Sequence, residues 1–223
     1  YATSLTYYSE GLRHAAEKND THAKSWILSN MSSVYLQLDK YTDALDSMMH
    51  SIALSEQNND TRHLAHCYNQ ICSIYRNMSN DSLALDYAMR SLSLYTTLAD
   101  RVGEANVLMN IARIFDKNGE VSIALDYAQK SHTLHCESST KEGETESLLL
   151  IASAYEKSHH LSLALEAAQQ ALIIAEQINS HPLLQSALRQ LHRLALLIGN
   201  PELAHEYGVK LEITTTTLAK EEQ

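Results

Sequence analysis

The sequence predicts an all-α chain of antiparallel helical hairpins stacked side by side, and two observations carry that prediction. One is an internal repeat with a period of forty residues. The other is the spacing of apolar residues within each copy, which recur three or four positions apart, as on one side of a helix. A strict period without insertions indicates that each copy contacts its neighbours in the same way, as in a solenoid.

The repeat is clearest at an Ala-Leu dipeptide and at an aromatic residue nine positions before its alanine. The dipeptide recurs as Ala44-Leu45, Ala84-Leu85, Ala124-Leu125 and Ala164-Leu165, and decays to Ala204-His205. The aromatic residue is Tyr35, Tyr75, Phe115 and Tyr155, with Ala195 in the last copy. We therefore divide one solenoid domain, 1–223, into a truncated repeat with its linker (1–24), full repeats (25–64, 65–104, 105–144, 145–184) and a degenerate C-terminal repeat (185–223).

Each full repeat is predicted to contain two amphipathic helices. In the first one the apolar stripes are Leu28, Met31, Tyr35 and Leu38, then Ala44, Leu45, Met48 and Ile52. Because residues 1–24 supply only a second helix, we expect the chain to be an excerpt of a longer protein. His205 and Gly208 replace packed residues of the earlier copies, which favours either a capping unit at the other end or a transition to a different structure.

Turn and cap residues support these boundaries. Asn118-Gly119-Glu120 suits a tight hairpin in which Gly119 ends a helix with left-handed geometry. The connections between repeats are expected to be the longer ones, and Asp20 and Asp60 should cap the helices that follow them. Pro182 and Pro201 each suit the first turn of a helix, where no amide hydrogen is required.

These columns resemble the tetratricopeptide repeat, in a variant lengthened to forty residues. The best-matching positions are Leu108, Ile111, Ala112, Phe115, Gly119, Ala124 and Ser131. The resemblance covers nearly the whole chain and implies a right-handed α-α superhelix whose first helices line a concave face. The chain departs from the family pattern at Ala128, where the family has an aromatic residue, at His192 in the small-residue column, and in lacking the closing proline.

Composition excludes several classes of function. The chain has 17 basic and 27 acidic residues and a net charge of −10, so direct binding of nucleic acid is disfavoured. No run of about eighteen apolar residues predicts a membrane span. The three cysteines fit neither a disulfide framework nor a zinc ribbon, and reduced thiols favour the cytoplasm, although a periplasmic sensor segment with buried thiols stays compatible.

If the resemblance holds, side chains of the first helices face a groove that binds a peptide or protein segment. Amides recur there at the repeat spacing and can hydrogen-bond an extended backbone, and basic residues make the groove less negative than the rest of the chain. The alternative is that the amides bridge adjacent helices and the arginines pair with neighbouring carboxylates. The candidate groove residues are Trp26, Asn30, His66, Asn69, Gln70, Arg76, Asn106, Asn110, Arg113, Lys117 and Lys157, and the last copy adds Arg189, Gln190 and Arg193.

Metal binding and catalysis are weaker interpretations. His63 and His66 have helical metal-ligand spacing, as do His132 and His135, but no third ligand stands at a matching position. No phosphate-binding loop, nucleophile elbow or zinc helix motif appears in the sequence. We therefore expect no enzyme activity, no metal and no cofactor.

The favoured hypothesis is a non-catalytic peptide- or protein-binding module. The forty-residue unit resembles repeats of bacterial regulators, which implies a sensory or regulatory segment in signal transduction or transcriptional control. The alternative is a structural scaffold that self-associates through its outer face or its last helix, near Leu211 and Ile213. A metal-dependent enzyme comes last.

Overall fold

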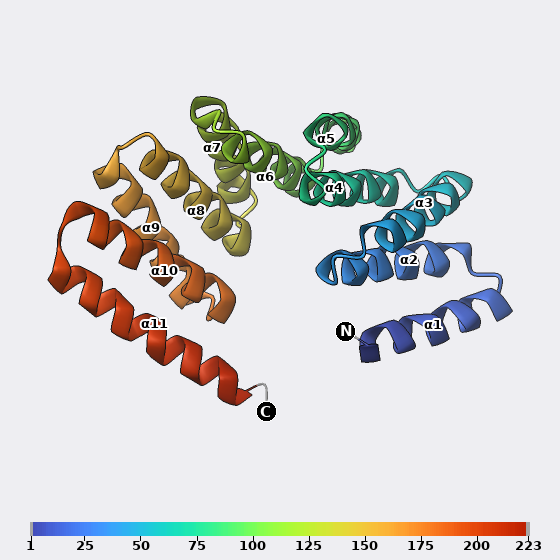
Figure 1. Ribbon diagram of the computed structural model, residues 1–223. Helices are drawn as coiled ribbons and strands as arrows, with labels where there is room; N and C mark the ends of the chain where they lie inside the picture. The colour runs from blue at the N-terminus through green and yellow to red at the C-terminus, as the bar shows by residue number, and fades with distance from the viewer. Residues whose placement is uncertain (1, 222–223) are drawn as a thin grey trace. The chain divides into compact units, whose positions relative to one another are not determined.

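The computed structural model describes the backbone of residues 2–221 and the side chains of residues 3–216. The backbone of the described residues forms helices joined by short turns (Figure 1). The helices are α1 (Ala2–Glu17), α2 (Thr21–Gln37), α3 (Tyr41–Gln57), α4 (Thr61–Asn77), α5 (Asp81–Thr97), α6 (Arg101–Lys117), α7 (Val121–Glu137), α8 (Lys141–Lys157), α9 (Leu161–Gln177), α10 (His181–Ile198) and α11 (Pro201–Glu221). The predicted fold class, an all-α solenoid of helical hairpins, is confirmed.

The connections between repeats are no longer than those within them, so that prediction was wrong. α3 ends at Gln57 and α4 begins at Thr61, which leaves three residues, as many as between α2 and α3. The extra length lies in the helices, because α2 to α9 have 17 residues each. The predicted caps explain the early start of α2 and α4: Asp20 accepts a hydrogen bond from the Ala23 amide at 2.9 Å, and Asp60 accepts one from the His63 amide at 3.0 Å.

A residue with left-handed backbone geometry ends nearly every helix. In the hairpin between α6 and α7 this residue is Gly119, with φ 78°, as the sequence predicts. The amide after it folds back, since Glu120 N donates to the Phe115 carbonyl at 2.9 Å, which closes the helix in the manner of a Schellman motif. The corresponding positions, twenty residues apart, are Asn19, Asp39, Asn59, Ser79, Ala99, Gly119, Ser139, His159, Asn179 and Gly199.

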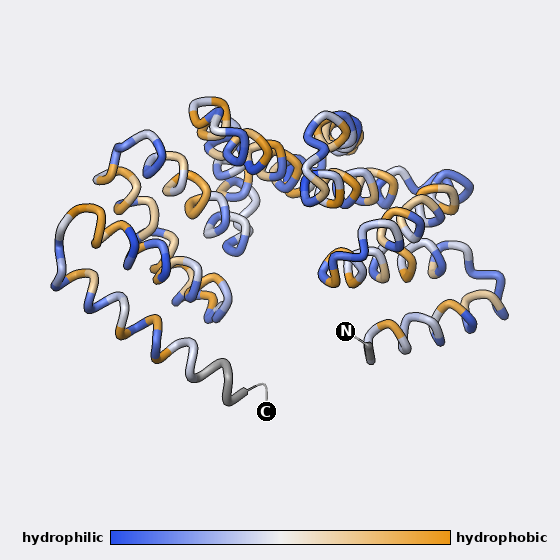
Figure 2. Tube along the Cα trace, viewed as in Figure 1, coloured by the Kyte–Doolittle hydropathy of each residue, from blue (hydrophilic) through white to orange (hydrophobic). Residues whose placement is uncertain are grey.

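The chain divides into two compact units, residues 1–103 and residues 104–223. One cluster of buried residues in the first unit consists of Met48 and Ile52 of α3 with Cys67 and Ile71 of α4. The core of the second unit is built from α6 to α11 and includes Leu188 and Leu191, which are almost fully buried. Hydrophobic and hydrophilic residues are mixed along each helix, so the stability comes from one packed side of each helix (Figure 2).

A buried serine of the second helix fixes its register against the first helix of the same hairpin. Ser91 Oγ donates to the Ala65 carbonyl at 2.7 Å, and Ser131 Oγ donates to the Ala105 carbonyl at 2.8 Å. Ser51 makes the same bond to the Ser25 carbonyl at 2.7 Å. These side chains are fully buried, so each hydroxyl satisfies its donor without water.

Where a second helix carries a large ring in one repeat column, the next first helix carries a glycine opposite it. Tyr95 of α5 lies against Gly103 of α6, and His135 of α7 lies against Gly143 of α8. A Cβ atom at either glycine would overlap the facing ring. The pairs therefore pack by size complementarity, which explains why the sequence column holding Tyr95 and His135 varies so widely.

Candidate binding site on the first helices

The candidate site is the outward side of the first helices, called here the first-helix face. In the first unit it belongs to α2 and α4, which contact each other, and in the second unit to α6, α8 and α10, of which α8 and α10 are in contact. Because the helices keep a forty-residue register, equivalent positions follow one another from repeat to repeat.

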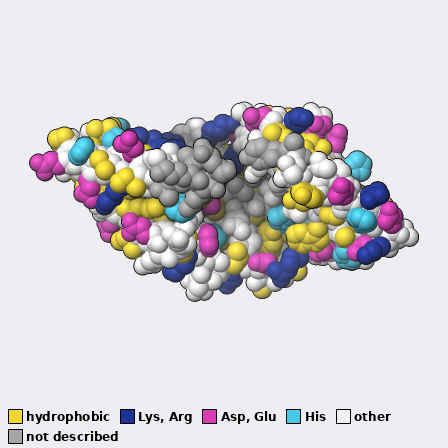
Figure 3. All heavy atoms as spheres, turned by 90° about the horizontal axis from the view of Figure 1, so that it is seen from below, with side chains coloured by type: hydrophobic (Ala, Val, Ile, Leu, Met, Phe, Trp, Pro, Cys, Tyr) yellow, Lys and Arg dark blue, Asp and Glu magenta, His cyan; other side chains and the backbone are white. Residues whose placement is uncertain are grey.

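Ion pairs between successive first helices neutralise several of the predicted groove cations. Arg113 Nη2 of α6 lies 2.8 Å from Glu146 Oε2 of α8, and Lys157 Nζ of α8 lies 2.8 Å from Asp116 Oδ2 of α6. Figure 3 likewise shows Lys and Arg side chains interspersed with Asp and Glu on the face that it presents. For these two cations the alternative interpretation holds, since the arginine and the lysine pair with neighbouring carboxylates.

Amide side chains also link adjacent first helices. Gln70 Nε2 of α4 donates to Ser33 Oγ of α2 at 3.3 Å. Gln190 Nε2 of α10 donates to the Leu149 carbonyl of α8 at 3.3 Å. These amides stabilise the stacking of the helices, which reduces what they can offer to a bound backbone.

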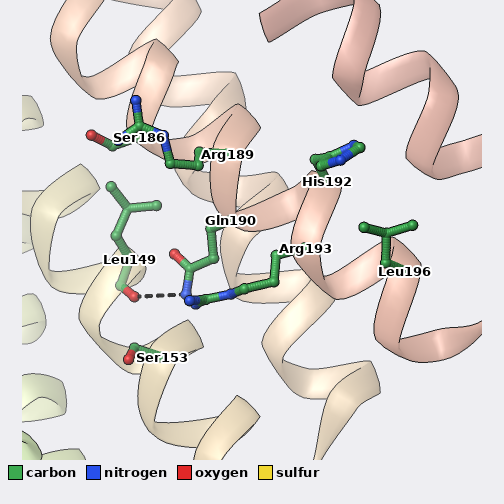
Figure 4. Close-up of a pocket in the computed structure, with 8 residues that line it drawn as sticks. All are labelled: Leu149, Ser153, Ser186, Arg189, Gln190, His192, Arg193 and Leu196. Carbon is green, nitrogen blue, oxygen red and sulfur yellow. Dashed lines mark hydrogen bonds between the residues drawn. The ribbon is translucent and has the colours of Figure 1, made fainter.

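A depression of this face lies between α8 and α10. It has a volume of about 590 Å³. In Figure 4 residues from both helices surround it, and the dashed line marks the hydrogen bond between Gln190 and Leu149. Its lining residues are Leu149, Ser153, Ser186, Arg189, Gln190, His192, Arg193 and Leu196.

A second depression of about 380 Å³ adjoins it and shares Leu149, Ser153 and Ser186. It reaches the Arg113–Glu146 pair of α6 and α8. The two together form a continuous groove along the first helices of the second unit, called here the α8/α10 groove.

Arg189 is the basic residue of this groove that has no carboxylate partner among the described residues. Arg193, one turn further along α10, is 2.7 Å from Glu156 Oε2. Arg189 is exposed and lies over the groove beside Leu149. A guanidinium next to an aliphatic wall binds a carboxylate that is flanked by apolar atoms.

Comparison with known proteins finds likeness in structure and none in sequence. No family model matches the chain, and no characterised relative matches its sequence. Among solved structures, BtubC (BKLC) from P. vanneervenii has a TM-score of 0.79 at 12% identity, covering 98% of this chain and 90% of that one. The nearly identical TPR-like repeats of a kinesin light chain from Podosopora anserina give a TM-score of 0.67 at 14% identity, covering 86% of this chain and 95% of that one.

The second of these structures consists almost entirely of the matched repeats. The chain folds as a tetratricopeptide-type solenoid. The signal transduction ATPase with a tetratricopeptide repeat sensor from Pyrococcus horikoshii gives a TM-score of 0.73 at 19% identity. The match covers 97% of this solenoid but about a third of the ATPase, 35%. At these identities the likeness is one of fold.

The tetratricopeptide-type pattern accommodates its departure at His192. In the first full repeat Ser32 occupies that small-residue column, and its Oγ donates to the Ala44 carbonyl at 2.8 Å. His192 Nδ1 makes the equivalent bond to the Ala204 carbonyl at 2.7 Å. Since a carbonyl only accepts, Nδ1 carries the proton, and the larger side chain preserves the contact between the two helices of the hairpin.

Three aromatic rings stack at the start of the first-helix face of the solenoid. The ring of Trp26 lies 3.9 Å from that of His63 and 5.9 Å from that of His66, measured between centroids. Trp26 is 43% exposed, whereas His63 is fully buried with its Nδ1 unpartnered within the described structure. Burial lowers the pKa of both histidines, so they stay neutral at physiological pH.

The histidines and Cys67 singled out in the sequence make contacts with neighbouring polar side chains or lie in the core. No group of three or more His, Cys, Asp or Glu side chains suited to a metal occurs among the described residues. His63 Nε2 contacts Ser51 Oγ at 3.1 Å, and His135 Nδ1 contacts Thr140 Oγ1 at 2.7 Å. Burial raises the pKa of the Cys67 thiol to about 11, which suits a core residue rather than a ligand.

The predicted site residues are distributed over both units. Of the groove residues predicted from sequence, Arg113, Arg189, Gln190 and Arg193 line the α8/α10 groove. The lining residues Leu150, Leu183, Ser186 and Leu196 were missed. Leu196 stands in a column that holds Arg76, Asp116 and Glu156 in the three preceding repeats and Leu36 in the first, and the return to leucine was the available signal. Trp26, Asn30, Lys117 and Lys157 are exposed, and His66, Asn69, Gln70, Arg76, Asn106, Asn110 and Arg113 are half-buried.

None of the helices in the described part of the chain combines the length and the apolar character that crossing a bilayer requires.

Proposed function

We propose that this solenoid is a non-catalytic interaction module that binds a peptide or partner segment in the α8/α10 groove. The observation that carries the proposal is the Arg189 guanidinium, which lies over a groove with an aliphatic wall and has no carboxylate partner among the described residues. In a chain of net charge −10, an uncompensated cation in a depression favours an anionic ligand.

The groove suits a segment in which a carboxylate stands next to an apolar side chain. Arg189 would form a charge-assisted, bidentate hydrogen bond with the carboxylate. Leu149 and Leu196 would cover the apolar side chain, and the Ser153 hydroxyl, which also lines the groove, would bind the ligand backbone.

We further propose that the module is the sensory or regulatory segment of a larger bacterial regulator of signalling or transcription. Support comes from the Pyrococcus horikoshii ATPase, whose tetratricopeptide repeats are described as its sensor. In a stack of repeats, small rotations at each interface add along the chain, so a ligand that spans several repeats can shift the end of the module.

The test is binding to an array of ten-residue peptides that contain Leu with Asp, Glu or a free C-terminus, and to isosteric amide versions. Wild type should prefer the carboxylates, and Arg189→Gln should weaken their binding about 10–100-fold, the loss expected for one charged hydrogen bond. Arg13→Gln removes the same charge from an exposed residue of α1 and should change nothing. Equal binding by wild type and Arg189→Gln would exclude this groove.

A second candidate is self-association through α11. Val209 and Ile213 stand one turn apart, and 61% of Ile213 is exposed, which is unusual for isoleucine. Sedimentation of wild type and Ile213→Lys at several concentrations tests this scaffold hypothesis. A wild-type dimer that the substitution dissociates would support it, and a monomeric wild type would dismiss it.

A further inference from the structure

The opposite side of the first unit carries a groove that the proposed function does not use. It lies between α3 and α5, the second helices of two successive repeats, with Tyr68 of α4 beneath them. Two adjoining cavities of about 470 and 270 Å³ both include Tyr68 and Arg90, so they form one depression, called here the α3/α5 groove.

The walls of the α3/α5 groove depart from the repeat pattern. Met49 and Met89 occupy the same column, and their side chains are 52% and 54% exposed. The next two repeats place Gln129 and Gln169 in that column. Since later repeats stack with glutamine there, the stacking of helices does not require these exposed methionines.

The lining residues form one face on each helix. On α3 they are Met49, Ile52, Ala53 and Glu56, which follow the helical i, i+3, i+4, i+7 pattern. On α5 they are Asp86, Met89, Arg90, Ser93 and Leu94, which follow the same kind of pattern. Each face spans about two turns, or about 11–12 Å, which matches the contact length of a short amphipathic helix laid in a groove.

The charges around the α3/α5 groove favour a basic ligand. Arg90 is already engaged, because its Nη2 lies 2.9 Å from Asp86 Oδ2 and its guanidinium stacks over the Tyr87 ring at 5.1 Å. Glu56, on the other wall, is exposed and has no ion-pair partner in the part of the chain that the structure describes. The groove therefore keeps an uncompensated carboxylate.

We propose that the α3/α5 groove docks an amphipathic helix of a partner protein, with an apolar stripe flanked by Lys or Arg. The apolar side chains pack between Met49 and Met89, whose flexible thioethers adapt to the shape of the inserted residue. The basic side chains pair with Glu56 and extend the Asp86 network. This surface lies on other helices than the α8/α10 groove, so the two can be tested separately.

The probe is a fluorescein-labelled Leu/Lys peptide of about 14 residues with a helical i, i+3, i+4, i+7 leucine stripe. Two comparison peptides are the Leu/Glu version and a scrambled Leu/Lys version that keeps charge but loses the stripe. Fluorescence anisotropy gives each Kd for wild type, for Met49→Gln with Met89→Gln, and for a control with Leu163→Gln and Ile173→Gln. The test variant installs the glutamines of the later repeats, and the control removes two exposed apolar side chains from α9, which are 43% and 53% exposed.

The expected result is that the test variant raises the Kd of the striped Leu/Lys peptide at least about tenfold, as loss of central anchor side chains does, while the control changes it less than about twofold. Circular dichroism and the urea midpoint of the test variant should match wild type. Equal losses in the two variants, equal binding of the scrambled or Leu/Glu peptide, or no binding below about 0.1 mM would overturn the proposal. So would a wild-type dimer that the methionine substitutions dissociate, because the occupant would then be a second copy. Arg189→Gln should leave this Kd unchanged, so failure here is separate from failure of the α8/α10 groove.

Discussion

Replacing Gly103 by alanine should change stability in a direction that residue 95 decides. The added Cβ would overlap Tyr95 Cδ1, Cε1 and Cγ. The ring cannot move aside into solvent because it is buried, with an exposed fraction of 7%. Overpacking of this kind costs about 1–3 kcal/mol, and the higher helix propensity of alanine returns up to about 1 kcal/mol. We expect a net loss of about 1–2 kcal/mol in the free energy of unfolding.

With Tyr95→Ser in place the ring is gone, and Gly103→Ala should then stabilise by up to about 1 kcal/mol. Tyr95→Ser alone should cost about 3–5 kcal/mol, the range for deleting a buried aromatic ring. Serine is a suitable background because Ser55 occupies this column in the first full repeat and donates to the Ser51 carbonyl at 2.8 Å.

The assay is urea unfolding of the four proteins followed by circular dichroism, analysed as a double-mutant cycle. Gly119→Ala serves as the control, because its cost comes from a φ of 78° with no atom near the new Cβ. That cost should be equal in both backgrounds. If Gly103→Ala has the same effect with and without the ring, within about 0.5 kcal/mol, the size-complementarity argument is refuted.

Three further predictions concern titration, thiol reactivity and capping. Burial is the main cause that lowers the pKa of four histidines, so near and below the ordinary pKa of 6.5 the folded chain binds fewer protons than the unfolded chain. Their contribution to stability is therefore complete above about pH 6.5 and is lost as the pH falls below it. Urea midpoints measured between about pH 7.5 and 5 should fall with pH, and a constant midpoint would contradict this prediction. These histidines are His63, His66, His132 and His135. In native protein a colorimetric thiol reagent should modify exposed Cys136 first, while Cys67 and Cys72, buried and with pKa about 11, should react only on unfolding; three equally fast thiols would disprove this burial. Asp20→Ala should cost about 0.5–2 kcal/mol through loss of the Ala23 amide bond, and an unchanged melting temperature would show that the cap contributes nothing.

The register of the fold could be predicted from the sequence because the apolar columns repeat without insertion. Helix lengths were less predictable, since Asn59 and Asp60 suit a linker as well as a helix start. The left-handed backbone of Asn59 ends α3 and the side chain of Asp60 caps α4, so three residues are enough to connect the two helices. A longer linker was expected between the repeats, whereas the helices extend to within three residues of each other.

The site was less predictable than the fold because its polar contacts join residues of different repeats. Arg113 pairs with Glu146 and Asp116 with Lys157, at separations of 33 and 41 residues. These separations lie close to the repeat length, so the ion pairs can be predicted only once successive first helices are known to be neighbours. Arg189 has no carboxylate partner among the described residues because none lies beside it on α8 as Glu156 lies beside Arg193, and this arrangement is visible only in three dimensions.

Departures from the columns separate stability from recognition in this solenoid. Ala44, Ala84, Ala124 and Ala164 are identical and fully buried, so every repeat uses them for packing. Met49 and Met89 differ from the glutamines of the next two repeats, Arg189 differs from Leu149 in the preceding repeat, and all three are exposed, so packing does not explain them. Because Gln129 and Gln169 show that the fold tolerates a polar residue in the methionine column, restoring that residue at Met49 and Met89 should leave the free energy of unfolding unchanged. Loss of binding in such a variant would then be a loss of recognition alone.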